Sequence, residues 1–296
     1  MTPTHPADSS TPVGPTGPHG ADHGRDADPR LAGAPNFRAV APLETSDGRR
    51  LRARRLFRSD ALHRLTDRDL DTLAALRIGA VLDLRRQDER ASMPSRWPAV
   101  APRETLTFDV MPDLQAVRAG GWRVQLGAAE FDADGAHRWM VDTYARMPAA
   151  LGGAVRAAAR RLADTAPPAD TAPPAGAATP AGVLVHCTAG KDRTGFVVAM
   201  LLAALRVPQD VILEDYLESG RRQPPEVLAR RLLEMTREQP SARELGAIET
   251  IASVRPEFLA TALRAVEHGH GSIDGYLDAC GVDAALRAAL AHALLD

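Results

Sequence analysis

The chain has 296 residues, 45% of them hydrophobic and 25% charged, which is enough to bury the core of one or two domains. Its 36 Lys and Arg residues nearly balance its 38 Asp and Glu residues, for a formal net charge of -2. This balance gives no support for binding to nucleic acid or to a membrane surface, so any strong positive field must be local.

The N-terminal segment, from Met1 to about Arg30, is predicted to be a disordered tail. It is rich in Pro, Gly, Asp, Ser and His and cannot bury enough apolar surface to fold. It lacks the basic and apolar parts of a signal peptide, and no apolar run in the chain has the length of a membrane span. We therefore expect a cytoplasmic protein without stable membrane insertion, and export without a signal peptide stays open.

A mixed α/β domain is predicted from Leu31 onward. Thr66, with Asp69 three residues later, has the pattern of a helix N-cap and predicts an amphipathic helix through Leu76. Four β-like segments precede or follow this helix. In the last of them, apolar and polar residues alternate, as in a half-buried strand. They are Asn36–Val40, Arg55–Arg58, Gly79–Leu84 and Thr105–Val110.

The stretch from Ala136 to about Leu162 is predicted to form two helices, the second beginning with Pro148 at its first position. The hexapeptide Asp-Thr-Ala-Pro-Pro-Ala then occurs twice, at 164–169 and 170–175. Its proline density disfavours helix and sheet. The segment at about 164–181 is therefore predicted to be a surface loop inserted into a domain that spans residues 31–296.

An apolar strand, Gly182–Val185, and an apolar helix, Phe196–Leu205, are predicted on either side of a short polar loop. The rest of the chain is predicted to be helical, and its segment from Arg221 to Ser253 is either a lid over a pocket or a hairpin of the scaffold. The expected helices are Val211–Leu217, Pro225–Glu238, Ala242–Ala252, Pro256–His268, Ile273–Ala279 and Val282–Leu295. The predicted fold class is α/β, with a central, mostly parallel sheet flanked by helices.

The polar loop carries the chemistry predicted for the chain. Residues His186–Gly195 read His-Cys-Thr-Ala-Gly-Lys-Asp-Arg-Thr-Gly. A strand, a tight loop and a helix start direct backbone N–H groups and a positive helix end at an anion. Cys187 opens the loop and Arg193 closes it, with five residues between them. The loop is predicted to hold a thiol and a guanidinium around one small anion, for which phosphate is the best fit.

Cys187 is the predicted nucleophile, because a thiol at a helix N-terminus beside cationic groups ionises more readily than a free cysteine. Arg193 offers a planar fork that can hold two phosphoryl oxygens in the transition state. Thr188, Ala189 and Gly190 are expected to bind the substrate, since their backbone N–H groups can point inward and form an anion nest.

Three neighbouring residues are expected to support this chemistry. Thr194 is expected to donate a hydrogen bond to the sulfur and to help it leave a thiophosphate intermediate. Lys191 is expected to add a positive charge at the mouth of the pocket. His186 is expected to fix the loop by hydrogen bonding rather than to act as a general base.

These residues resemble the signature loop of cysteine-dependent protein tyrosine and dual-specificity phosphatases. With Gly190-Lys191-Asp192 inside the loop, the chain is similar to the bacterial branch typified by mycobacterial protein tyrosine phosphatase B. The resemblance covers about Leu31 to Asp296. Its further segments are Asn36-Phe37-Arg38, Leu56-Phe57-Arg58-Ser59, Asp83-Leu84-Arg85, Asp215-Tyr216-Leu217 and Val254-Arg255-Pro256-Glu257-Phe258-Leu259. The chain departs from the family pattern at Ala39–Pro42, in the insertion, and in a shorter Arg221–Ser253 segment.

The resemblance implies hydrolysis of phosphotyrosine, phosphoserine or phosphothreonine in proteins, or of phosphoinositides, without a metal or other cofactor. In resembling phosphoinositide phosphatases, a lysine at the offset of Lys191 contacts further phosphates of the ring; the alternative is that Lys191 only favours the thiolate. Three other functions remain open: a diphosphoinositol or polyphosphate hydrolase, a non-catalytic phosphate-binding module, and a sulfurtransferase, whose loop is usually one residue shorter.

The leaving oxygen needs a proton, and a carboxyl is the usual donor. Three aspartates compete for this role: Asp192 inside the loop, Asp83 at the end of a predicted strand, and Asp113 after a proline. The resembling family is thought to use the aspartate that matches Asp192, and we assign the role to this residue. Asp83 and Asp113 are the alternatives.

Overall fold

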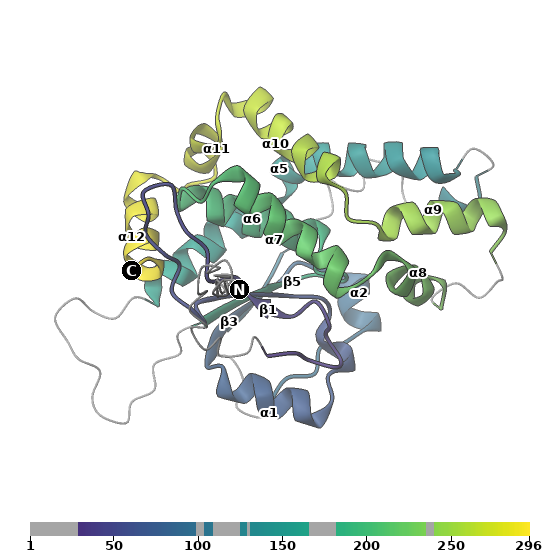
Figure 1. Ribbon diagram of the computed structural model, residues 1–296, viewed down its shortest axis with the longest axis horizontal. Coiled ribbons are helices and arrows are strands. Elements are labelled where there is room, and N and C mark those ends of the chain that lie inside the picture. The colour runs from purple at the N-terminus through teal and green to yellow at the C-terminus, as the bar shows by residue number, and fades with distance from the viewer. Residues whose placement is uncertain (1–28, 99–103, 109–124, 129–130, 166–181, 235–239) are drawn as a thin grey trace, which may run out of the picture.

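A five-stranded sheet lies at the centre of the molecule (Figure 1). The computed structural model describes residues 29–98, 104–108, 125–128, 131–165, 182–234 and 240–296. The strands are β1 (Arg38–Ala39), β2 (Leu56–Ser59), β3 (Ile78–Asp83), β4 (Glu104–Thr107) and β5 (Gly182–His186), in the order β1-β2-β5-β3-β4. β1 is antiparallel to β2, and the other neighbouring pairs are parallel. The predicted central, mostly parallel sheet is confirmed.

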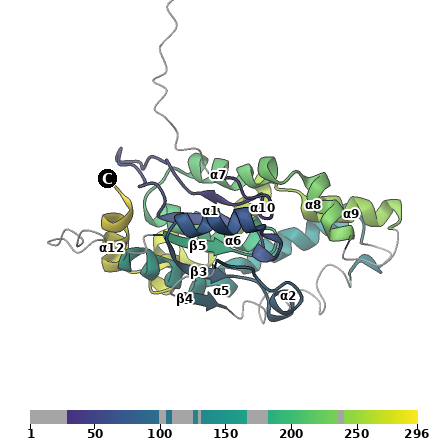
Figure 2. The ribbon, with the colours of Figure 1, turned by 90° about the horizontal axis from the view of Figure 1, so that it is seen from below.

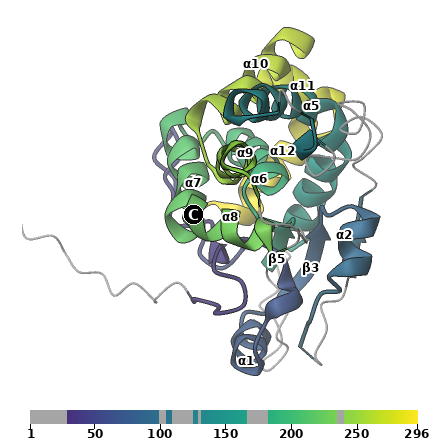
Figure 3. The same ribbon diagram turned by 90° about the vertical axis from the view of Figure 1, so that its right-hand side faces the viewer.

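The middle strand, β5, divides its side chains between two cores. Val183 and Val185 belong to the larger core, with α5 (Ala133–Asp164) and α6 (Asp192–Ala204). Leu184 belongs to a smaller core with α1 (Asp67–Ala75). Figures 1 and 3 show α1 on one side of the sheet and α5 and α6 on the other, and Figure 2 shows α1 lying across the sheet near β5. Burial on both faces explains why this strand has an uninterrupted apolar sequence.

The remaining helices complete the two layers around the sheet, and most of them lie in the last third of the chain. A short helix, α2, had no counterpart in the sequence prediction, because none of its side chains is buried and it has no apolar periodicity. These helices are α2 (Gln87–Ser92), α7 (Gln209–Arg222), α8 (Pro225–Leu233), α9 (Ala242–Ala252), α10 (Pro256–His270), α11 (Ile273–Ala279) and α12 (Ala284–Leu294).

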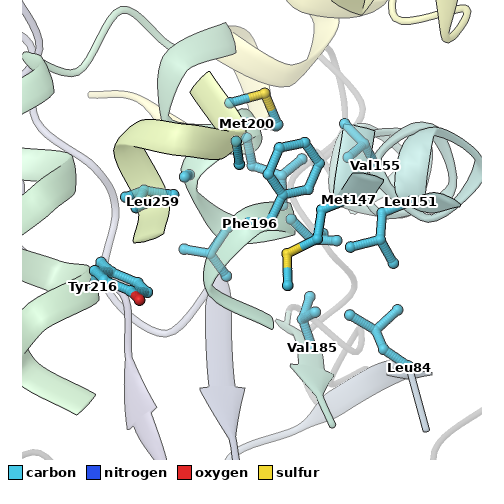
Figure 4. Close-up of a cluster of buried hydrophobic side chains, with 14 of the residues drawn as sticks. Leu84, Met147, Leu151, Val155, Val185, Phe196, Met200, Tyr216 and Leu259 are labelled. Carbon is cyan, nitrogen blue, oxygen red and sulfur yellow. The ribbon is translucent and has the colours of Figure 1, made fainter. Parts of the chain in front are cut away.

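The long helix α5 corrects the prediction of two helices separated at Pro148. It is one continuous helix with Pro148 inside it. A proline inside a helix removes one hydrogen bond and costs about 3 kcal/mol or more. Met147, Leu151 and Val155 are each at most 1% exposed (Figure 4), and burial of such side chains contributes about 1.5–3 kcal/mol apiece. Burial therefore outweighs the lost bond and holds both halves in one helix.

The segment from Arg221 to Ser253 packs on the scaffold. α8 packs against α9, and α9 packs along α5, as Figure 1 shows at one end of the molecule. Two contacts join this segment to the region of the polar loop. Lys191 Nζ donates to Ser253 O at 3.2 Å, and Arg231 Nη1 lies 3.8 Å from Asp60 Oδ2. Packing on α5 agrees with a scaffold hairpin and the two contacts agree with a lid, so both alternatives stay predictions.

Several predictions fall on residues outside the described ranges. These include the tail up to residue 28, most of the insertion, the strand positions after residue 108, and the end of the helix predicted over Pro225–Glu238. The tail and the insertion stay predictions. Within the described ranges, no helix combines the length and the apolar character needed to cross a bilayer.

The N-terminus of α1 offers a test of local stability. Thr66 Oγ1 accepts a hydrogen bond from Asp69 N at 3.2 Å, and Asp69 Oδ2 accepts one from Thr66 N at 2.9 Å, as in a capping box. Thr66→Ala should therefore lower the free energy of unfolding by about 1 kcal/mol. Urea denaturation measures this loss. Thr72→Ala, on the exposed side of the same helix, is the control, and an equal loss in both variants would contradict the capping role.

Candidate active site

The signature loop begins with Cys187, directly after β5, and ends with Arg193 in the first turn of α6, at the carboxyl end of the parallel strands. Ser59 of β2 and Asp83 of β3 are both in register with His186, the last residue of β5. The segments that follow parallel strands gather at this edge of a sheet, where ligands bind in α/β folds. The predicted order of strand, loop and helix is confirmed.

Three consecutive carbonyls of the loop accept hydrogen bonds from earlier segments of the chain. The pairs are Ala61 N to Thr188 O (3.0 Å), Asn36 Nδ2 to Ala189 O (2.9 Å) and Arg58 Nη2 to Gly190 O (2.9 Å). A peptide group whose oxygen is bonded on the outside directs its N–H to the inside, and a row of such groups forms an anion nest. The three outward carbonyls thus direct the N–H groups that follow them to the inside of the loop.

Gly190 is required by this geometry on two grounds. Its φ of +68° lies in the left-handed region, and a Cβ on it would lie 2.4 Å from Ser59 O. Its N–H donates to Cys187 Sγ at 3.2 Å, and the cysteine is only 1% exposed.

The prediction that Thr194 donates a hydrogen bond to the sulfur is wrong. Thr194 Oγ1 is buried without a partner in the described part of the chain.

Arg193 is held by a carboxylate that the sequence analysis missed. Its Nη1 and Nη2 donate to the two oxygens of Glu89 at 2.8 and 3.0 Å, and Nη1 also donates to Leu84 O at 2.9 Å. Thr188 Oγ1 donates to Glu89 as well, at 2.6 Å. Burial opposes ionisation of Glu89, but the charge and hydrogen bonds of Arg193 hold the pKa of this carboxyl far below its usual range. Glu89 therefore fixes the guanidinium plane beside the loop.

The sequence predicted Lys191 at the mouth of the pocket, but the structure buries it. The residue is 3% exposed, and its Nζ donates to Asp192 Oδ1 at 2.8 Å and to Ser253 O at 3.2 Å. The amine is drawn inward because a buried ammonium needs a carboxylate and carbonyl partners. Its charge thus neutralises Asp192 and ties the end of α9 to the loop.

Asp192 lies in the first turn of α6 with its side chain 25% exposed. Its Oδ1 also accepts a hydrogen bond from Tyr144 Oη, at 2.6 Å, on the central part of α5. Tyr144 has one proton and gives it to Asp192, so Tyr216 Oη, 2.8 Å away, is the donor to Tyr144 Oη. Burial and the charge of Asp192 raise the pKa of the Tyr144 hydroxyl, so it stays protonated and remains a donor.

Asp83 and His186 form a buried pair behind the loop. Both oxygens of Asp83 accept from Arg85, at 2.9 and 2.7 Å, and this bonding lowers the pKa of the carboxyl although burial opposes it. A carboxylate held in this way is a poor proton donor. Burial lowers the pKa of His186 to about 4, so the ring is neutral, and its Nε2 lies 3.6 Å from Asp83 Oδ2.

Among the described residues, Nδ1 of the His186 ring has no partner. A hydrogen bond between the ring and the backbone of Cys187 opposes the effect of burial on the pKa, in keeping with the expected contact with the loop. The main chain of His186 also accepts a hydrogen bond from Leu84 N at 2.9 Å. Asp113 lies outside the described residues. Cys187, Asp192 and Arg193 thus belong to one loop and the helix start that follows it, whereas both oxygens of Asp83 are engaged by Arg85.

Asp60, which follows β2, is a further carboxyl that the sequence analysis missed. It is 3% exposed, accepts a hydrogen bond from Asn36 N at 3.2 Å, and lies beside the backbone of Gly190. Burial raises the pKa of Asp60 to about 7. Its position directly after a strand at the carboxyl edge of the sheet was the available signal.

Asp60 predicts a pH dependence of stability. Its folded-state pKa of about 7 lies above that of an unfolded Asp, so its contribution is fully present below about pH 4 and is lost as the pH rises through 7. Between pH 5 and pH 8, wild type should lose a few kcal/mol of unfolding free energy, on the basis of about 1.4 kcal/mol per pKa unit. Asp60→Asn should lose less over this range. Urea denaturation at both pH values tests this, and equal losses would contradict it.

A thiol and a guanidinium at the two ends of an anion nest form the arrangement of a cysteine-dependent phosphatase. A family model described as the tyrosine phosphatase family matches residues 29–296. The chain is 35% identical over 279 residues to "Triple specificity protein phosphatase PtpB" of Mycobacterium tuberculosis. This match covers 86% of this chain and 94% of that protein. It is 33% identical over 269 residues to a putative tyrosine-protein phosphatase of Cupriavidus necator, which covers 84% of this chain and 83% of that protein.

The chain therefore belongs to the tyrosine phosphatase family. One solved structure, that of P. aeruginosa TpbA, matches 72% of this chain and 89% of its own at 17% identity and a TM-score of 0.29. This overlap is too low to bear on the argument.

Proposed function

We propose that the enzyme hydrolyses phosphate monoesters through a cysteinyl-phosphate intermediate formed on Cys187. The observation that carries this proposal is the row of outward carbonyls at Thr188, Ala189 and Gly190, which leaves inward N–H groups between the thiol and Arg193. Fixed N–H donors of this kind stabilise the charge of a transferring phosphoryl group without reorganisation during the reaction.

In the first step, the sulfur of Cys187 attacks phosphorus and the bond from phosphorus to the ester oxygen breaks. The loop N–H groups and Arg193 bind the equatorial oxygens. Among the described residues, the Nε of Arg193 has no hydrogen-bond partner, so this N–H is available to the phosphoryl group. Asp192 takes up on Oδ2 the proton that the monoester monoanion brings and gives this proton to the departing oxygen.

In the second step, water attacks phosphorus, Asp192 takes a proton from the water, and the Cys187 thiolate leaves. The contacts of Asp192 suit both roles. Tyr144 and Lys191 both donate to Oδ1, so a proton can bind to and leave Oδ2 while these two hydrogen bonds persist. The same carboxyl therefore serves as acid in one step and as base in the next.

Phosphotyrosine in proteins is the first substrate class of the proposal, with phosphoserine and phosphothreonine beside it. Support comes from the relatives, one of which has a name that states triple specificity. Phosphoinositides are the second class, and they rest on the resemblance alone. The buried position of Lys191 gives no support for a contact with further ring phosphates. Action on these substrates in the cytoplasm is part of the same proposal.

Cys187→Ser should reduce hydrolysis by at least about a thousandfold while binding of phosphopeptide is retained, because the nucleophile is lost and the nest is not. Initial rates on a phosphotyrosine peptide, on phosphoserine and phosphothreonine peptides, and on individual phosphoinositides measure this and rank the substrates. Cys280→Ser is the matched control. Cys280 is the half-buried residue that ends α11 beside Tyr276, and it takes no part in the proposed reaction. Full activity of Cys187→Ser would rule out the cysteinyl-phosphate route.

Asp192→Asn should slow the first step by about 10²- to 10⁴-fold for an aryl phosphate with a poorly acidic phenol. For a strongly acidic phenol the loss in that step should be small, because this leaving group departs without a proton. Single-turnover rates across a series of aryl phosphates measure the dependence. Asp83→Asn and Asp113→Asn are the comparisons, and a leaving-group dependence in either of them instead would overturn the assignment of Asp192.

A further inference from the structure

Two of the outward carbonyls of the signature loop accept hydrogen bonds from side chains that take no part in the proposed reaction. Of the three donors to its outward carbonyls, one is the backbone of Ala61 and two are the side chains of Asn36 and Arg58. Both side-chain donors belong to one buried group, which we call the Asp215 cluster. It consists of Asn36, Arg38, Arg58, Asp215 and Ser219.

We propose that Asp215 is a positioning residue which, through two arginines and an asparagine, keeps the carbonyls of the signature loop turned away from the phosphoryl group. The inference rests on the proposed function of that loop. Asp215 lies on α7, and in the described part of the chain its carboxylate is joined to the loop through Arg38 and Arg58.

The direct path runs through Arg58. One end of its guanidinium is ion-paired with Asp215 Oδ2, and the other end, Nη2, donates to Gly190 O at 2.9 Å. A planar guanidinium fixed at one side presents its other N–H groups in a set direction. The carboxylate therefore aims the donor that holds the Gly190 carbonyl.

The second path is longer and ends at the neighbouring carbonyl. Asp215 Oδ1 accepts from Arg38 Nε at 3.2 Å, and Arg38 Nη1 donates to Asn36 Oδ1 at 2.5 Å. An amide whose oxygen is bonded on one side presents its Nδ2 to the other side. This Nδ2 is the group that donates to Ala189 O.

The Asp215 cluster needs the carboxylate of Asp215 to balance the charges of its two arginines. The side chains of Arg58 and Arg38 are 0% and 3% exposed, and that of Asp215 is 10% exposed. Burial and the neighbouring charge of Arg58 lower the pKa of Arg38 to about 9. Burial opposes ionisation of Asp215, but Arg58 and Arg38 lower its pKa, so it is charged at neutral pH. Without this charge, two buried guanidinium groups would face each other with no other counter-ion among the described residues.

Gly190 explains why the loop needs such a support. Glycine adopts positive and negative φ about equally well, so the peptide groups on either side of it can rotate at low cost. Rotation of the peptide after Gly190 would replace an inward N–H by an inward carbonyl oxygen, which repels a phosphate dianion. Loss of the cluster should therefore weaken binding of the phosphoryl group and of its transition state together.

The test compares Asp215→Asn with Glu218→Gln, which removes a surface carboxylate on the same helix that pairs with Arg221 and Arg222. In Asp215→Asn, kcat on an aryl phosphate should fall and the inhibition constant of vanadate should rise, each by about 10- to 100-fold, as is typical of a misplaced site. Glu218→Gln should match wild type in both. A lower melting temperature of Asp215→Asn with unchanged vanadate inhibition would overturn the inference.

Asn36→Asp covers the case in which Asp215→Asn does not fold. It keeps an oxygen for Arg38 and replaces the donor to Ala189 O by a second oxygen, so it should weaken vanadate inhibition in the same way. Wild-type vanadate inhibition in this variant would also overturn the inference. Wild-type enzyme that neither hydrolyses aryl phosphates nor responds to vanadate would instead contradict the proposed function.

Discussion

The structure depends on one constraint of the peptide group: its N–H and its C=O point in opposite directions. A loop that turns several N–H groups toward an anion must supply donors for the carbonyls on its other side, where water is excluded. Here those donors come from Asn36, Arg58 and Ala61, in segments that precede the loop by more than a hundred residues. The sheet order makes this possible, because β2 lies beside β5 and brings its following residues to the outside of the loop.

Charge in the site is closely balanced before any substrate binds. Arg193 is paired with Glu89, Lys191 with Asp192, and the two buried arginines share Asp215. In the proposed function, the attraction for a phosphate therefore comes mainly from oriented N–H groups and the start of α6, with Arg193 adding a guanidinium held in place. Such an arrangement costs little reorganisation when the anion enters.

The sequence was most informative where function depends on consecutive residues. The strand, the loop and the helix start around Cys187, and the N-cap at Thr66, are local patterns, and the structure has them. Glu89, Tyr144 and Asp60 were missed because their roles arise from neighbours distant in sequence. The inward position of Lys191 depends on Ser253, sixty-two residues away. The single helix α5 depends on burial of both its halves, which a local rule about Pro148 cannot include.

Pro148 has a mechanical consequence for the site. A proline cannot donate to the carbonyl four residues before it, and in α5 that carbonyl belongs to Tyr144. The helical turn that carries the hydroxyl partner of Asp192 thus has one main-chain bond fewer than an ordinary turn. Packing against Phe258 and Tyr216 holds its ring from the sides. The hydroxyl of Tyr144 is therefore positioned more by the packing of its ring than by the main-chain bonds of its own turn.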